Sequence, residues 1–118
     1  PESPTTWHLQ VKDETGKVMG YGMLRAFKPL PNFSQTAEIT YFLSPDHTGQ
    51  GLGGRLLDYL ETEGRKKGIS ILLAEISSLN PGSIHFHRKN GFVDCGCFKQ
   101  VGKKKGQIFD VVWMQKTI

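Results

Sequence analysis

Residues 48–55 read T-G-Q-G-L-G-G-R and join a strand-like segment to a helix-like one. Before them, residues 36–43 (T-A-E-I-T-Y-F-L) predict a β-strand that ends ahead of Pro45. After them, four leucines have the spacing of one face of a helix, Leu52, Leu56, Leu57 and Leu60. A glycine-rich turn that opens a helix presents free backbone N–H groups at the positive end of the helix dipole. The junction therefore predicts a loop that binds phosphate.

A P-loop is the first phosphate-binding motif to consider. Gly49 and Gly54 have its spacing, but the chain continues with Arg55 and Leu56. A P-loop needs lysine and then serine or threonine at those two positions, to hold the phosphates and Mg²⁺. The pattern therefore argues against nucleotide hydrolysis.

The dinucleotide-binding pattern G-x-G-x-x-G is a second alternative, since Gly49, Gly51 and Gly54 match it. Glu75 lies at about the distance at which an acidic residue binds the ribose in that motif. Against it, residues 45–48 separate the predicted strand from the first glycine, and 118 residues are few for both halves of such a fold. A dinucleotide-binding fragment remains an alternative.

A second motif occupies residues 80–92, N-P-G-S-I-H-F-H-R-K-N-G-F. Asn80 is suited to cap a helix that we expect over residues 83–90. Gly91 can end this helix in the left-handed conformation, and Phe92 can begin a new strand. The segment predicts a short helix with a defined start and stop.

Residues 51–53 and 80–92 together resemble the two motifs of the GNAT family of N-acetyltransferases, Q/R-x-x-G-x-G/A and N-x-x-[AS]-x-x-[FL]-[YH]-x-x-x-G-[FY]. Thr48 stands where that family usually has arginine or glutamine. More of the chain is similar to the phosphinothricin and methionine-sulfone acetyltransferase branch, at residues 27–33, 36–38, 100–102, 106–111 and 114–115.

The resemblance implies an α/β (α+β) fold, with a mostly antiparallel mixed sheet, one splayed parallel strand pair and flanking helices. The chain alone predicts strands over residues 7–11, 18–25, 36–43, 69–76, 92–101 and 107–116, and helices over 51–65 and 83–90. The apolar run 69–76 is expected to be a central strand covered on both faces. We expect one domain over residues 1–118, shortened before Trp7 by about one strand and two helices relative to the family.

The function that the resemblance implies is transfer of acetyl from acetyl-CoA to the amino group of a small amino acid or analogue, by direct attack in a ternary complex. A non-catalytic acyl-CoA-binding or regulatory module is the alternative. The resemblance also implies a cytoplasmic homodimer whose partner is a small-molecule amine. We expect no catalytic metal, because His85 and His87 lack the i, i+4 spacing of helical zinc ligands.

The coenzyme site that the resemblance implies lies at the splayed strands and the glycine loop. The pantetheine arm would follow the backbone of the first parallel strand, with the Leu43 N–H donating to the thioester oxygen. The implied coenzyme contacts are Tyr41, Phe42, Leu43, Gly49, Gln50, Gly51, Leu52, Gly53, Gly54, Asn80 and Ser83.

Two residues are candidates for proton transfer. An α-amine has a pKa of about 8 and attacks only when neutral, so a base helps, and the resemblance assigns Glu38 to this role. Alternatively, Glu38 is a solvent-facing or salt-bridged strand carboxylate. His87 would protonate the leaving thiolate, or orient ligands without transferring a proton. The resemblance implies that Phe27, Ile39 and Thr40 line the pocket for the acceptor side chain. It also implies that Lys28 binds the acceptor carboxylate, and the alternative is that Lys28 is a solvated loop lysine.

Composition and charge favour a globular domain that binds neither membrane nor nucleic acid. Hydrophobic residues make up 37% of the chain, and no apolar run approaches the ~20 residues of a membrane span. The net charge is +4, but the basic runs at 65–67 and 103–105 contain no aromatic residues for stacking on bases. Cys95 and Cys97 are expected to be buried or half-buried thiols in a reducing cytosol.

Overall fold

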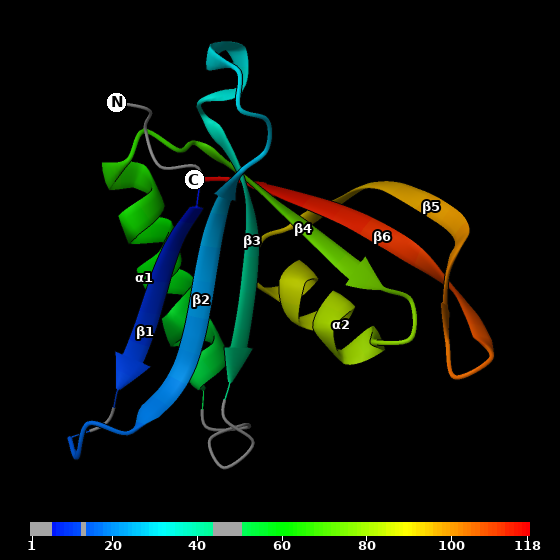
Figure 1. Ribbon diagram of the computed structural model, residues 1–118, viewed down its shortest axis with the longest axis horizontal. Coiled ribbons are helices and arrows are strands. Elements are labelled where there is room, and N and C mark those ends of the chain that lie inside the picture. The colour runs from blue at the N-terminus through cyan, green and yellow to red at the C-terminus, as the bar shows by residue number, and fades with distance from the viewer. Residues whose placement is uncertain (1–5, 13, 44–50) are drawn as a thin grey trace.

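The computed structural model describes residues 6–12, 14–43 and 51–118. Six strands form one sheet, accompanied by two α-helices and a 3-10 turn (Figure 1). In chain order the elements are β1 (Thr6–Lys12), β2 (Val18–Ala26), η1 (Pro31–Phe33), β3 (Thr36–Leu43), α1 (Leu52–Lys66), β4 (Ile71–Ser77), α2 (Pro81–Lys89), β5 (Val93–Lys104) and β6 (Gln107–Thr117).

The strand order across the sheet is β1-β2-β3-β4-β6-β5. The neighbours β3 and β4 are parallel and joined through α1, whereas all the other neighbouring pairs are antiparallel. A mostly antiparallel mixed sheet with one parallel pair was predicted, and the topology confirms it.

The parallel pair separates partway along its length, as predicted. Its register runs only from Thr36–Ile71 to Glu38–Leu73. Beyond that position β3 continues to Leu43 and β4 to Ser77, but the two strands no longer pair with each other. Their arrows diverge in Figure 1. The opening lies at the carboxyl ends of both strands, where ligands of open parallel sheets usually bind.

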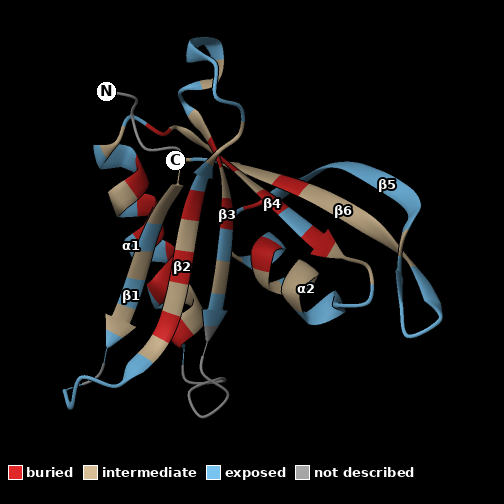
Figure 2. Ribbon diagram, viewed as in Figure 1, coloured by how far each residue is buried: buried red, intermediate tan, exposed pale blue. Residues whose placement is uncertain are grey.

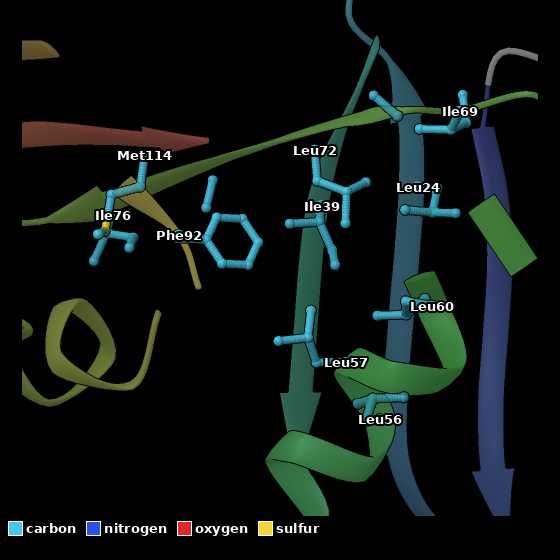
Figure 3. Packing of buried hydrophobic residues seen from close by; sticks show 12 residues of the cluster. Leu24, Ile39, Leu56, Leu57, Leu60, Ile69, Leu72, Ile76, Phe92 and Met114 are labelled. Carbon is cyan, nitrogen blue, oxygen red and sulfur yellow. The ribbon is translucent and has the colours of Figure 1, made fainter. Parts of the chain in front are cut away.

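The core lies on the side of the sheet that the helices cover. Leu56, Leu57 and Leu60 of α1 belong to one buried cluster with Leu24 of β2 and Ile39 of β3 (Figure 3). The same cluster continues to its far members near α2, Ile76, Phe92 and Met114. The helical spacing of the leucines therefore predicted the packed face of α1 correctly.

One glycine of β2 sets the distance between α1 and the sheet. A Cβ at Gly22 would lie 2.7 Å from Leu60 Cδ1, so a larger residue there would force the Leu60 side chain to shift. Figure 2 shows the resulting band of buried residues on α1 and β2.

The prediction that the 69–76 run is covered on both faces was wrong. In β4, Leu72, Ala74 and Ile76 are buried. Of the alternate residues, Leu73 is half-buried and Glu75 is exposed. The physical reason is that both helices pack on one cluster, so the described elements leave the opposite face of β4 without a covering layer.

Three elements have a boundary that differs from the prediction by more than one residue. The second helix begins at Pro81 rather than residue 83, because Asn80 caps it and proline suits the first helical turn. β4 begins at Ile71, since the Ile69 N–H donates to the Gly64 carbonyl and so closes the end of α1. β5 begins one residue after Phe92 and continues to Lys104.

Candidate active site

A cavity of about 240 Å³ lies at the opening between β3 and β4. β4 contributes the wall formed by Ala74, Glu75, Ile76 and Ser77. The other wall consists of residues predicted for the site from β3 and α2: Ile39, Thr40, Tyr41, Phe42, Asn80, Ser83 and His87. Residues that lie far apart in the sequence therefore surround one cavity, and the most distant pair, Ile39 and His87, is separated by 48 positions.

The edge of β3 that faces this cavity offers backbone hydrogen-bonding groups. The Gln35 carbonyl accepts from Ile71 N–H, so the odd-numbered residues of β3 point their N–H and C=O groups toward β4. Tyr41 and Leu43 lie beyond the last register pair with β4, on this open edge. Phe42 points its backbone groups toward Tyr21 of β2 instead, so it lines the cavity without offering them.

Glu38 lies at the last paired position before the opening. Its neighbours Ala37 and Ile39 face the core, so its side chain extends to the other face of the sheet. There it forms an ion pair with Arg25, which is directly opposite in the β2–β3 register. Arg25 Nη2 and Nε lie 2.5 and 3.2 Å from Glu38 Oε2. The salt-bridged alternative for Glu38 is thus observed. Glu38 also lies directly before the point where β3 and β4 separate.

His87 is 5% exposed and is held through both ring nitrogens. Its Nδ1 lies 2.7 Å from the Ser83 carbonyl oxygen, which can only accept, so Nδ1 carries the proton. Its Nε2 lies 2.8 Å from the Tyr41 hydroxyl and accepts from it. The rings of Phe86 and Phe92 stand edge-on to the imidazole. Burial lowers the pKa of His87, opposed by the Ser83 hydrogen bond, so the neutral form is favoured.

Tyr41 is a partner that the sequence did not reveal. Burial raises the pKa of its phenol, with a further contribution from the charge of Glu61, so the hydroxyl keeps its proton and donates. We predicted only backbone contacts for Tyr41, because residues 41 and 87 are far apart in the sequence. His85, by contrast, is exposed.

The described part of the phosphate-binding loop is the start of α1. Gly51 has a φ of 74° as the residue before the helix, and a Cβ at Gly51 or Gly54 would meet nothing within 4 Å. The turn is therefore open enough for a ligand to approach its backbone. Gly49 and Gln50 lie outside the described residues, as do Thr48 and the side chain of Leu43.

Asn80 combines capping with a place on the cavity wall. Its Oδ1 accepts the Ser83 N–H over 3.1 Å, which confirms the predicted helix cap. Gly91 has a φ of 94°, which confirms the predicted left-handed stop. The start of α2, and through it His87, is thus held by a local hydrogen bond.

The predicted acceptor residues lie in two places. Ile39 and Thr40 line the cavity, whereas Phe27 and Lys28 belong to the connection that follows β2. The Phe27 and Phe33 rings stand edge-on, with centroids 5.8 Å apart, and Lys28 Nζ lies 5.5 and 5.7 Å from them. The structure therefore brings Lys28 together with aromatic rings, and its role in binding a carboxylate stays a prediction.

The cysteine prediction was wrong in one respect. Cys95 and Cys97 are free thiols, as expected, but both are exposed. They lie on β5, which is at the edge of the sheet and pairs only with β6, so no second layer of the described chain covers them.

Two other features are absent from the described residues. Residues 6–12, 14–43 and 51–118 contain no group of three or more His, Cys, Asp or Glu side chains that could hold a metal ion. In the same residues, neither helix is long and apolar enough to cross a membrane.

Comparison with known proteins defines the class to which this site belongs. Residues 1–92 match the acetyltransferase (GNAT) family. The chain therefore belongs to the GNAT family, and the sheet with its diverging parallel pair is the GNAT fold.

Individual relatives are named as N-acyltransferases. The chain is 38% identical over 105 residues to the L-amino acid N-acyltransferase MnaT of Escherichia coli, covering 89% of this chain and 61% of the relative. It is 36% identical over 110 residues to an L-methionine sulfoximine/L-methionine sulfone acetyltransferase of Pseudomonas paraeruginosa, covering 93% and 64%. The chain thus spans about three fifths of the length of these curated relatives.

A solved structure agrees with them. The GNAT superfamily phosphinothricin acetyltransferase of Sinorhizobium meliloti, in complex with AcCoA, superimposes with a TM-score of 0.85 at 32% identity. The match covers 94% of this chain and 60% of that one. The predicted resemblance to this branch is confirmed.

Proposed function

We propose that this chain is an acetyl-CoA-dependent N-acetyltransferase that acts on the α-amino group of a small amino acid or analogue. The observation that carries the proposal is the cavity between β3 and β4, bordered by an open strand edge, with His87 in its wall and Glu38 at the last paired position before the two strands separate. The amino-acid acetyltransferases among the relatives support the substrate class. Action as a cytoplasmic homodimer is part of the proposal and rests on the family resemblance.

The coenzyme would lie in the opening as an additional strand. Its pantetheine amides would pair with the backbone groups of Tyr41 and Leu43, which pair with no strand of the described residues on that side. The Leu43 N–H would then donate to the thioester oxygen, where negative charge develops during attack. The pyrophosphate would bind at the start of α1, where N–H groups and the helix dipole favour an anion. No metal ion is required by this arrangement.

The reaction would need two proton transfers. Glu38 would take a proton from the α-ammonium group, directly or through a water, so that the neutral amine attacks the thioester carbonyl. The C–S bond then breaks, and the thiolate accepts the second proton of the amine nitrogen. His87 Nε2 accepts from Tyr41 and has no proton to give in the resting state, which favours the orienting role for His87. In that role, His87 fixes the Tyr41 phenol at the cavity.

The test is release of free thiol from acetyl-CoA by the purified chain, with methionine sulfone and other amino acids as acceptors and a reaction without acceptor as control. Acceptor-dependent release supports the proposal. Glu38→Gln should then lower turnover by about 10²- to 10⁴-fold, and His87→Phe should lower it as well, while acetyl-CoA binding by calorimetry is retained. A wild-type pH–rate profile in Glu38→Gln would contradict its role as the base, and wild-type turnover in His87→Phe would contradict the orienting role of His87.

A second candidate is a non-catalytic acyl-CoA-binding module. The observation that favours it is the Arg25–Glu38 ion pair, because the guanidinium occupies the carboxylate that would have to receive the proton of the amine. Acetyl-CoA binding without thiol release for any amine would support this alternative. Absence of acetyl-CoA binding would overturn both candidates.

A further inference from the structure

We propose that Arg25 binds the carboxylate of the acceptor, and that this binding releases Glu38 from its ion pair to act as the base. The inference rests on the proposed function and names a residue that the sequence analysis did not include. It assigns to Arg25 the preference for acceptors that carry a carboxylate next to the amine.

The position of Arg25 is the first argument. Arg25 and Glu38 are directly opposite each other on adjacent strands, and Glu38 is also the last residue of β3 that pairs with β4. The ion pair therefore borders the opening from the sheet face opposite α1. Arg25 retains a 56% exposed side chain, whereas that of Glu38 is 16% exposed. The guanidinium is accessible from solvent and close to the candidate base.

The hydrogen bonds of the pair provide the second argument. Arg25 Nε and Nη2 both contact a single carboxylate oxygen, Glu38 Oε2. A guanidinium can instead bind both oxygens of a carboxylate through two parallel hydrogen bonds, and this geometry is the stronger one. An incoming carboxylate can therefore offer Arg25 a better arrangement than Glu38 does in the resting chain.

Charge balance is the third argument. An α-amino acid carries an ammonium and a carboxylate on neighbouring carbons, and the Glu38–Arg25 pair presents the two complementary charges side by side. Binding would exchange one ion pair for two, between Arg25 and the acceptor carboxylate and between Glu38 and the ammonium. Glu38 would then take one ammonium proton and become a neutral carboxylic acid, leaving the neutral amine that attacks the thioester.

Other charges nearby are consistent with this assignment. Arg25 interacts chiefly with Glu38, and Glu75 on β4 adds a smaller electrostatic attraction. Lys28, the residue predicted to bind the carboxylate, has its ammonium group over the rings of Phe27 and Phe33. Arg25 is in direct contact with the candidate base, so it is better placed to couple carboxylate binding to proton transfer.

The experiment compares two acceptors in several variants of the whole chain. The acceptors are methionine sulfone and the corresponding amine without a carboxylate, 3-(methylsulfonyl)propylamine. Arg25→Gln removes the charge and keeps most of the side-chain length. We expect kcat/KM for methionine sulfone to fall about 10- to 100-fold, the range for a lost hydrogen bond to a charged group. We expect kcat/KM for the amine to be unchanged or higher, because Glu38 is no longer paired.

One control variant and one competing variant separate this role from other effects. The control is Lys66→Gln, which removes an exposed ion pair with Glu63 on α1 and should leave the ratio of kcat/KM values for the two acceptors as in the wild type. Lys28→Gln tests the competing carboxylate-binding residue, and Arg25→Lys should recover part of the preference for methionine sulfone that Arg25→Gln loses. An equal loss for both acceptors in Arg25→Gln, or the selective loss in Lys28→Gln instead, would overturn the inference.

Calorimetry with methionine sulfone in the presence of coenzyme A gives a readout that does not depend on turnover. Binding that weakens in Arg25→Gln but not in Lys66→Gln supports the inference even if the wild type releases no thiol. In that case the proposed function fails while the carboxylate site stands. Unchanged binding in Arg25→Gln would overturn the inference whatever the activity.

Discussion

The two edges of β3 differ sharply in what they do. Toward β2, the strand is paired without interruption from Ala37–Ala26 to Leu43–Gly20, and α1 packs on the same pair through its leucines. Toward β4, pairing stops at Glu38, and a cavity lined by polar side chains replaces it. One strand therefore serves two regions, a packed region with α1 and an open region with the candidate site. The difference suggests that stability and chemistry can be perturbed separately.

The largest expected effect is a loss of stability caused by a substitution in the packed region alone. Leu60 is fully buried between α1 and β2, so Leu60→Ala should lower the free energy of unfolding by about 2–5 kcal/mol. Urea denaturation followed by circular dichroism measures the loss. The control is Leu30→Ala, at a 55% exposed leucine, which should change stability by less than about 0.5 kcal/mol. The folded fraction of Leu60→Ala should bind acetyl-CoA as the wild type does. Weakened binding at equal folded fraction would contradict the separation of the two regions.

A smaller loss of stability is expected when the ion pair of Glu61 is broken. Glu61 is the one charged side chain that is buried in the described part of α1. Glu61 is 4% exposed and pairs with Lys116 of β6 over 2.8 Å. Lys116→Met leaves this carboxylate with the longer contact to Arg65, at 3.5 Å. Breaking a buried pair costs about 3–5 kcal/mol, and we expect about 2 kcal/mol here because Lys116 retains 23% exposure.

A double variant sharpens the interpretation of Lys116→Met. Glu61→Leu combined with Lys116→Met replaces both charges by apolar groups and should recover much of the lost stability, as measured by urea denaturation. Equal losses in the single and double variants would show that Lys116 contributes through packing rather than through its charge.

The smallest expected effect concerns the open region and depends on pH. Burial lowers the pKa of His87 in the folded chain below its unfolded value, so between these two values the unfolded chain binds more protons. Stability should therefore be complete above about pH 6.5 and fall as the pH decreases through that value. His87→Gln should lose this part of the pH dependence, as judged by urea midpoints at pH 7.5 and 5.5. An unchanged difference between the two pH values in this variant would contradict the prediction.

Much of the fold was predictable because its determinants are local. The spacing of Leu52, Leu56, Leu57 and Leu60 indicates a helix and its buried face, and the strand–glycine–helix order indicates a parallel pair. Asn80 and Gly91 marked the ends of α2 through capping, which depends only on near neighbours in the chain. Within the candidate site, the motif resemblance led to residues from β3 and α2 that the structure brings around one cavity.

The remaining features depend on contacts between distant segments, and only the tertiary structure decided them. The Arg25–Glu38 pair follows from the β2–β3 register, which the irregular connection at residues 27–35 leaves undetermined in the sequence. The Tyr41–His87 hydrogen bond joins residues that are 46 positions apart. The exposure of Cys95 and of the outer face of β4 depends on which elements cover the sheet. Periodicity and capping encode local conformation, but register, side-chain pairing and layer coverage arise when separate elements pack together.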